Sequence, residues 1–153
     1  MRIDFREFII WNNLFVITLI FLSTEIFSFF NLINQYSIKI FWFIFLLIYL
    51  YFLKRNNLIK ITKEKFDLLN FESIFILTVF ILTFIIAIIY PPNTPDAMSY
   101  HMTRVMNWIQ NANINFYPTN DFRELILGPL PSILNLHLYL LVNGDYLTNL
   151  VQW

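Results

Sequence analysis

The chain has 153 residues, of which 58% are hydrophobic, 20% aromatic and only 13% charged, and its formal net charge at pH 7 is zero. A soluble domain of this length has too small an interior to bury so much apolar surface, so a bilayer must solvate most of the chain. Zero net charge provides no basic field for a nucleic-acid partner, and the absence of cysteine excludes disulfides and thiolate metal sites.

Apolar runs long enough to cross a bilayer recur along the chain, because a spanning helix needs about 20 apolar residues. They predict an all-α, multi-pass transmembrane helical bundle. The expected spans are residues 8–30, 36–53, 71–90 and 125–142, with the start of a fifth at 147–153. The first run is too long for a signal-peptide core and lacks a cleavage site, so we expect an uncleaved anchor. The interrupted fifth run predicts the N-terminal part of a longer protein or a truncated reading frame.

Basic residues concentrate on one side of these spans. Five lie between the second and third spans and two precede the first: Lys54, Arg55, Lys60, Lys63, Lys65, Arg2 and Arg6. The positive-inside rule assigns that side to the cytoplasm. We therefore expect a cell-membrane protein with a cytoplasmic amino terminus and an extracytoplasmic loop at residues 91–124.

Residues 96–111, DAMSYHMTRVMNWIQN, predict an amphipathic helix beside the outer membrane face. Thr94 can cap this helix, Pro95 suits its first position, and Asp96 falls in the first turn, where the helix dipole favours negative charge. At about 100° per residue, two opposite stripes form: Met98, Met102, Val105, Met106 and Ile109 on one, and Asp96, Tyr100, Thr103 and Asn107 on the other. Such a helix lies flat on a membrane with its apolar face down.

Three short motifs follow one another over residues 85–153. They are Asp96-Ala97-Met98-Ser99-Tyr100, then Gly128-Pro129-Leu130-Pro131, then Asn143-Gly144-Asp145 with Leu150 after it. In this order they resemble the acidic outer-loop motif, the Pro-Pro-Leu helix entry and the inner turn of the GT-C membrane glycosyltransferases, most closely the family 39 and protein-mannosyltransferase-like group. Two departures stand out. Ala97 occupies the position where the family often has a second acidic residue, and two additional spans precede the acidic loop.

The resemblance implies transfer of a sugar from a polyprenyl-phosphate donor to an acceptor on the outer face. Such a reaction needs a base for the acceptor hydroxyl and groups that stabilise the departing phosphate. Asp96 is then the catalytic base, and the expected substrate-binding residues are Tyr100, His101, Arg104 and Arg123. No cofactor is expected. His101 could also ligate a divalent metal, but no second ligand at metal spacing is visible. Whether the acceptor is a glycan, a lipid or a protein stays open.

Each candidate also has a structural interpretation. Asp96 could only stabilise its helix, and Arg104 could be an interfacial cation whose stem lies along apolar surface. Arg123 could pair with Asp121 or Glu124 in a solvated loop. No function is expected for Asp121 or Asp145, so replacement of either by Asn should be tolerated.

Polar residues elsewhere leave two other classes of function open. Asn135 and His137 could hydrogen-bond neighbouring helices, Glu25 could reach the interface, and Asp145 is expected in a turn. A transporter subunit would use paired ionisable groups within its helices, and only Glu25 and His137 are close to such positions. A non-enzymatic membrane assembly protein would need the helices but would leave the Asp96 segment unused.

Overall fold

The computed structural model describes residues 5–56 and 70–153, and in these two ranges the chain is helical and has no strand. This confirms the all-α expectation for the described part of the chain. In chain order the elements are α1 (Phe5–Phe29), α2 (Gln35–Asn56), α3 (Phe71–Ile89), the π-helix η1 (Ala97–His101), α4 (Met102–Asn111), α5 (Arg123–Ile126), α6 (Leu130–Val142) and the 3-10 helix η2 (Thr148–Val151).

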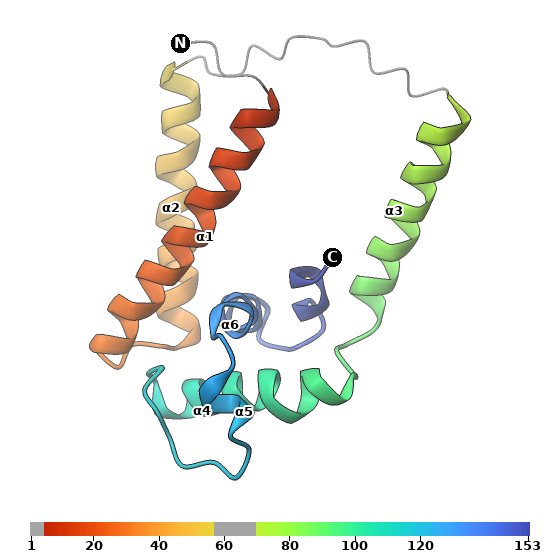
Figure 1. Ribbon diagram of the computed structural model, residues 1–153. Helices are drawn as coiled ribbons and strands as arrows, with labels where there is room; N and C mark the ends of the chain where they lie inside the picture. The colour runs from red at the N-terminus through yellow and green to blue at the C-terminus, as the bar shows by residue number, and fades with distance from the viewer. Residues whose placement is uncertain (1–4, 57–69) are drawn as a thin grey trace.

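Three helices are long and apolar enough to cross a membrane: Glu7–Phe29, Gln35–Arg55 and Phe71–Ile89. Their bounds agree with the first three expected spans to within two residues at each end. Figure 1 shows α1 beside α2, with α3 standing apart from both. Of the basic residues used for orientation, Arg2, Lys60, Lys63 and Lys65 lie outside the described residues.

The fourth expected span contains a much shorter helix. α5 ends at Ile126, Leu127 is extended, and α6 has 13 residues. At a rise of 1.5 Å per residue, α6 is roughly 20 Å long, against about 30 Å for the hydrocarbon core of a bilayer. The break has a local cause, because Pro129 and Pro131 lack the N–H groups that a continuous helix would need. Further on, where a fifth span was expected to begin, the chain forms the single turn of η2.

The packed core lies where α6 meets α1, α2 and α4. Ile20, Ile33, Ile38, Val105, Trp108, Tyr117, Ile133, Leu136 and Leu140 form one buried cluster there. η1 and α4 run crosswise beneath the three long helices (Figure 1). The chain after α4 is tied to the end of α1 and to the turn that follows it, since Ile33 N–H donates to the Ala112 carbonyl at 3.2 Å and Ile114 N–H to Ser28 Oγ at 2.9 Å.

His137 joins three helices, as the sequence predicted. Trp42 Nε1 lies 3.0 Å from His137 Nδ1, and an indole can only donate, so Nδ1 is the acceptor. The neutral ring therefore carries its proton on Nε2, which donates to Thr24 Oγ1 at 2.8 Å. The Thr24 hydroxyl in turn donates to the Ile20 carbonyl at 2.8 Å. Every polar atom of this buried chain of bonds has a partner, so it stabilises the α1–α2–α6 junction.

The other polar residues of the helices have different surroundings. Asn135 does not make the expected bond through its carbonyl, since its Oδ1 is buried and has no partner in residues 5–56 or 70–153. Glu25 is exposed near the end of α1. Asp145 lies in a turn, as expected, where its carbonyl accepts bonds from the Thr148 N–H at 3.0 Å and the Thr148 hydroxyl at 2.6 Å.

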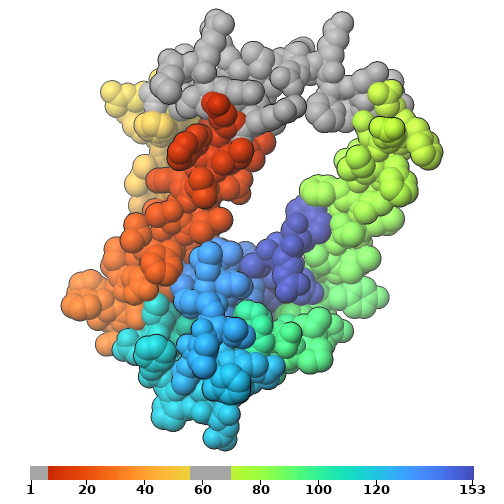
Figure 2. Space-filling view, viewed as in Figure 1, coloured from red at the N-terminus to blue at the C-terminus, as the bar shows by residue number. Residues whose placement is uncertain are grey.

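Figure 2 shows that α3 and α1 are separated in their upper parts, while α4, α6 and η2 fill the space between their lower ends. α3 contacts η2, and the Trp153 ring lies 4.3 Å and 4.6 Å from the rings of Phe80 and Phe84. The polar segment that follows α3 is therefore placed between the end of a long apolar helix and the packed core.

Candidate functional site

The helix after α3 starts as its sequence predicts. The Ala97 N–H donates to Thr94 Oγ1 at 3.2 Å, so Thr94 is the cap, and helical structure begins at Pro95. Asp96 therefore falls in the first turn, where the helix dipole favours its negative charge. Its carboxylate is 71% exposed. The first-turn position explains how Asp96 can stabilise the helix. Its carboxylate is nevertheless accessible to solvent and to ligands.

One π-turn changes which side chains of this helix are buried. The Met102 N–H bonds to the Ala97 carbonyl five residues back, and Thr103 Oγ1 donates to the Met98 carbonyl at 2.8 Å. The additional residue in the turn rotates η1 relative to α4. The straight apolar stripe expected from the sequence is therefore interrupted: Met102 is buried, but Met98 is 53% exposed and Met106 38% exposed.

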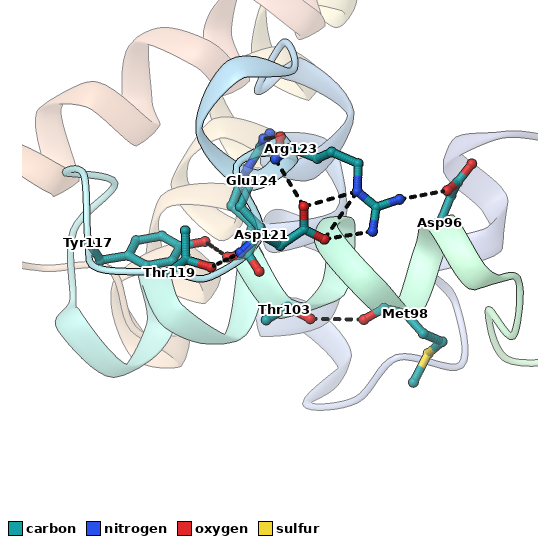
Figure 3. A network of polar contacts seen from close by, with 9 residues as sticks. Asp96, Met98, Thr103, Tyr117, Thr119, Asp121, Arg123 and Glu124 are labelled. Atoms are coloured by element: carbon teal, nitrogen blue, oxygen red, sulfur yellow. Dashed lines mark hydrogen bonds and ion pairs between the residues drawn. The ribbon is translucent and has the colours of Figure 1, made fainter.

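Arg123 brings together side chains from two separate segments (Figure 3). Its Nε lies 3.0 and 3.1 Å from the two carboxylate oxygens of Asp121, and its Nη2 lies 2.6 Å from Asp121 Oδ2. On the other side, Nη1 lies 3.5 Å from Asp96 Oδ1. The guanidinium carbon also lies 5.2 Å from the centre of the Tyr100 ring. We call Asp96, Tyr100, Asp121 and Arg123 the charged cluster.

The local sequence explains why Arg123 adopts this position. Asp121 Oδ1 accepts a bond from the Arg123 backbone N–H at 3.0 Å, so one carboxylate orients both the start of α5 and the arginine side chain. The Arg123 hydrogen bonds lower the pKa of Asp121, and the same bonds raise the pKa of Arg123. Both groups are therefore charged at neutral pH. A guanidinium has five N–H donors, so Nη1 remains able to bind a ligand while Nε and Nη2 hold Asp121.

Arg104, also expected to bind substrate, has a different environment. Its side chain is almost completely buried, with 1% of the residue exposed. Nη2 donates to the Arg123 and Leu127 carbonyls, both at 3.0 Å, and Nη1 contacts the Gly128 carbonyl and Ser132 Oγ at 3.4 Å. Arg104 thus satisfies the carbonyls at the end of α5 and anchors that segment on α4, and its guanidinium is turned toward backbone rather than toward the charged cluster.

A buried acid accompanies this buried cation. Tyr117 donates to Glu124 Oε2 at 2.5 Å, and both residues are buried. Burial is the main reason that the pKa of Arg104 is lowered, while Tyr117 and Glu124 oppose the shift. Burial, followed by the bond to Glu124, raises the pKa of Tyr117. These groups fix the loop that carries Arg123.

His101 lies beside the charged cluster but outside it. Its Nδ1 is 3.0 Å from Ser132 Oγ. Desolvation by burial, followed by the nearby charge of Arg104, lowers the pKa of His101, with Asp96 acting in the opposite direction. The ring is therefore neutral at physiological pH. Within the described ranges 5–56 and 70–153, no three acidic or histidine side chains are grouped closely enough to hold a metal ion.

The structure thus separates the five sequence candidates. Asp96, Tyr100 and Arg123 meet in one cluster, while His101 and Arg104 both contact Ser132 on the α6 side. Sequence reasoning gave Asp121 only a structural role, although its position two residues before Arg123 is a sign of a local cap and ion pair. The meeting of Arg123 with Asp96 depends on the path of residues 112–122, and no motif encodes that path.

Comparison of the chain with protein-family models, curated proteins and solved structures finds no match in any of the three.

Proposed function

We propose that the chain forms part of a multi-pass membrane glycosyltransferase that moves a sugar from a polyprenyl-phosphate donor to an acceptor on the extracytoplasmic face. The observation that carries this proposal is the pairing of Asp96, a 71% exposed carboxylate just after a long apolar helix, with Arg123, which Asp121 holds 3.5 Å away. A base and a cation side by side at a membrane exit match the two needs of sugar transfer from a lipid phosphate.

In the proposed reaction, the acceptor hydroxyl attacks the anomeric carbon of the donor sugar while Asp96 takes the hydroxyl proton. A carbon–oxygen bond forms, and the bond between the anomeric carbon and the phosphate oxygen breaks. The leaving phosphate keeps the bonding electron pair, and the free N–H groups of Arg123 stabilise its charge. Asp121 and Tyr100 keep the guanidinium in place, so little reorganisation is needed when that charge develops.

The location of the cluster also supports a lipid-linked donor. α3 ends at Ile89, and the helical segment carrying Asp96 begins at Pro95. The phosphate and sugar of a polyprenyl donor lie at the membrane interface, close to the end of a spanning helix, while its tail stays in the hydrocarbon. The orientation rests on Lys54 and Arg55 at the end of α2 and on the other basic residues of that side.

The rival functions have less support. A proton-coupled transporter needs ionisable groups inside its helices that are free to exchange protons. In this chain both ring nitrogens of His137 take part in hydrogen bonds, and Glu25 is exposed. A purely structural assembly protein would have no use for an exposed Asp96 with an anchored arginine beside it.

The proposal is tested by sugar transfer from a labelled polyprenyl-phosphate donor in membranes that carry the full-length protein. Membranes with the protein should transfer sugar and membranes without it should not. Arg123→Gln should raise the KM for the donor, because the variant loses the charge that meets the phosphate. Transfer that is equal with and without the protein, over a panel of donor sugars, would exclude the proposed activity.

A further inference from the structure

One cavity of the structure is lined by residues that follow Asp96 and Tyr100 of the charged cluster directly in sequence. This cavity of about 320 Å³ opens between the end of α3, residues 92–97, η1, α6 and η2. Its volume is at the lower end of the range of about 300–1,000 Å³ for small-molecule sites. Thr83 and Trp153 line it and are hydrogen-bonded to each other, and the other polar side chains of the lining belong to Asn93, Thr94, His101, Asn135, Asn149 and Gln152. We call this space the amide cavity.

The chemistry of its walls is uncharged. Of the described residues that line the cavity, four carry amides, and none is Asp, Glu, Lys or Arg. His101 is the one lining side chain that titrates near neutral pH, and its lowered pKa keeps it neutral. Neither a phosphate nor a metal cation would find a counter-charge there. Amides offer both donors and acceptors, which suits a ligand whose hydroxyl groups also donate and accept.

The lining residue Asn135 has an oxygen atom that lacks a partner among the described residues. Asn135 Oδ1 is buried and accepts no hydrogen bond from residues 5–56 or 70–153. A buried acceptor without a donor costs free energy, so the Asn135 amide gains a hydrogen bond by turning toward a ligand hydroxyl in the cavity. The neighbouring groups are already oriented. Asn149 Nδ2 donates to the Tyr90 carbonyl at 2.7 Å, and the bond between His101 Nδ1 and Ser132 leaves the other ring nitrogen for a ligand.

η1 connects the amide cavity to the charged cluster. Asp96 and Tyr100, four residues apart, contact Arg123, whereas Ala97 and His101, each one residue further along, line the cavity. Two adjacent rows of one short helix therefore serve two adjacent sites. The cavity also has an apolar wall formed by Ile86 and Ala87 of α3, on the side of the long membrane helix.

We propose that the amide cavity binds the uncharged glycosyl group of a lipid-linked ligand whose phosphate lies at Arg123. This inference rests on the proposed function, because that function supplies the phosphate beside the sugar. The difference in charge gives the two places different roles. The charged cluster binds the phosphate, and the amide cavity distinguishes a glycosylated lipid phosphate from a bare one. Free sugars share the same hydroxyl chemistry, so the test includes them.

Binding to the full-length protein in lipid nanodiscs, followed by tryptophan fluorescence, tests the proposal, since Trp153 lines the cavity. The probes are polyprenyl phosphate alone, the same lipid carrying a hexosyl, pentosyl or N-acetylhexosaminyl group, and the matching methyl glycosides. At least one glycosylated lipid should bind about tenfold more tightly than the bare lipid, an effect equal to one or two good hydrogen bonds. Equal affinity for the bare lipid and every glycosylated lipid would overturn the proposal.

Substitutions of lining residues test whether the preference for the glycosylated lipid arises in the amide cavity. Asn135→Leu should reduce the preference for the glycosylated lipid by about 3–10-fold and leave affinity for the bare lipid unchanged. Asn149→Leu, on another wall of the cavity, should act in the same direction and serves if the first variant does not fold. Asn111→Leu, at an exposed amide outside the cavity, is the matched control. An unchanged preference in both cavity variants would also overturn the proposal.

Two further results separate this inference from the proposed function. Arg123→Gln should weaken binding of bare and glycosylated lipids by the same factor. Competition by a methyl glycoside would show that the sugar alone is recognised, and its absence would show that the lipid-linked form is required. If Asp96→Asn transfers sugar normally while the Asn135-dependent preference persists, the proposed catalytic role fails and the binding site remains.

Discussion

The environment of Arg104 in the structure differs from the one that its sequence position suggests. As a cation in an interfacial segment it was expected to bind the donor, yet its guanidinium is buried and donates to the carbonyls of Arg123 and Leu127. No local pattern distinguishes these roles, because the carbonyls belong to a segment about twenty residues away. The difference for Asp121 has the opposite direction. No function was expected for this residue, yet its carboxylate orients Arg123.

Arg104→Gln should therefore destabilise the protein. The substitution leaves buried carbonyls without donors and Glu124 without its neighbouring cation, and the loss should be on the order of 3 kcal/mol. Thermal unfolding of the purified protein measures it, with Arg123→Gln, whose side chain is 40% exposed, as the control that should unfold normally. If Arg104→Gln were as stable as the wild type but no longer bound a polyprenyl phosphate, Arg104 would be a donor ligand after all.

Asp121→Asn should raise the KM for the donor about 3–10-fold, because Arg123 loses the charge-assisted bonds that hold it beside Asp96. We expect kcat to change less, since Asp121 does not touch the reacting atoms. The pKa of Asp121 is lowered, so the ion pair is complete above the usual carboxyl range and is lost only as pH falls through the lowered value. Donor KM measured from pH 8 to pH 5 should thus stay flat in the wild type. An unchanged donor KM in the Asp121→Asn variant would show that Asp121 does not position Arg123 for the donor.

At the scale of elements, the long helices were predictable because their signal is local. About 20 apolar residues in succession identify a span wherever they occur, and the Thr94 cap followed by Pro95 identifies a helix start. The fourth span was expected to be longer than α6, because the hydrophobicity of residues 125–142 indicated a span despite Pro129 and Pro131. The π-turn was not predictable, since one additional residue in a turn leaves no periodic trace in a segment this short.

Cysteine scanning from residue 96 to residue 111 should reveal that π-turn. The natural chain contains no cysteine, so single-cysteine variants give a clean background. Labelling should be weak at positions 97 and 102, which are both buried although five residues apart, and strong at the exposed positions 98 and 106. One uninterrupted period of 3.6 residues through position 102 would mean that the helix is continuous and that the charged cluster has another geometry.

At the scale of the molecule, the arrangement gathers polar groups at one end of three long apolar helices. The ends of α1 and α3 and the start of α2 lie at the end where α4 crosses (Figure 1), and the chain after α4 hydrogen-bonds to the end of α1 and to the turn that follows it. Sequence alone indicated this through the order of the spans. The contact of Asp96 with Arg123 could not be read in advance, because it depends on how α6 and the preceding loop pack against α4.

Reporter fusions after Arg55 and after Asn111 should report opposite sides of the membrane. The two positions lie at opposite ends of the long helices, and the basic residues near Arg55 favour the cytoplasm. A fusion after Asn31, in the turn between α1 and α2, should agree with the one after Asn111. Cytoplasmic signals from Asn31 and Asn111 would place the charged cluster inside and would contradict extracytoplasmic transfer.

The most direct test of the account is the turnover of Asp96→Asn. Asparagine keeps the shape of the side chain but cannot take the acceptor proton, so sugar transfer by membranes carrying the full-length protein should fall about 10²–10⁴-fold while the protein accumulates normally. Asp145→Asn, in a turn distant in sequence, should transfer as the wild type does. If Asp96 only stabilises its helix, the substitution should cost less than about 1 kcal/mol of stability and leave transfer intact. Normal transfer by Asp96→Asn would contradict the assignment of the catalytic base.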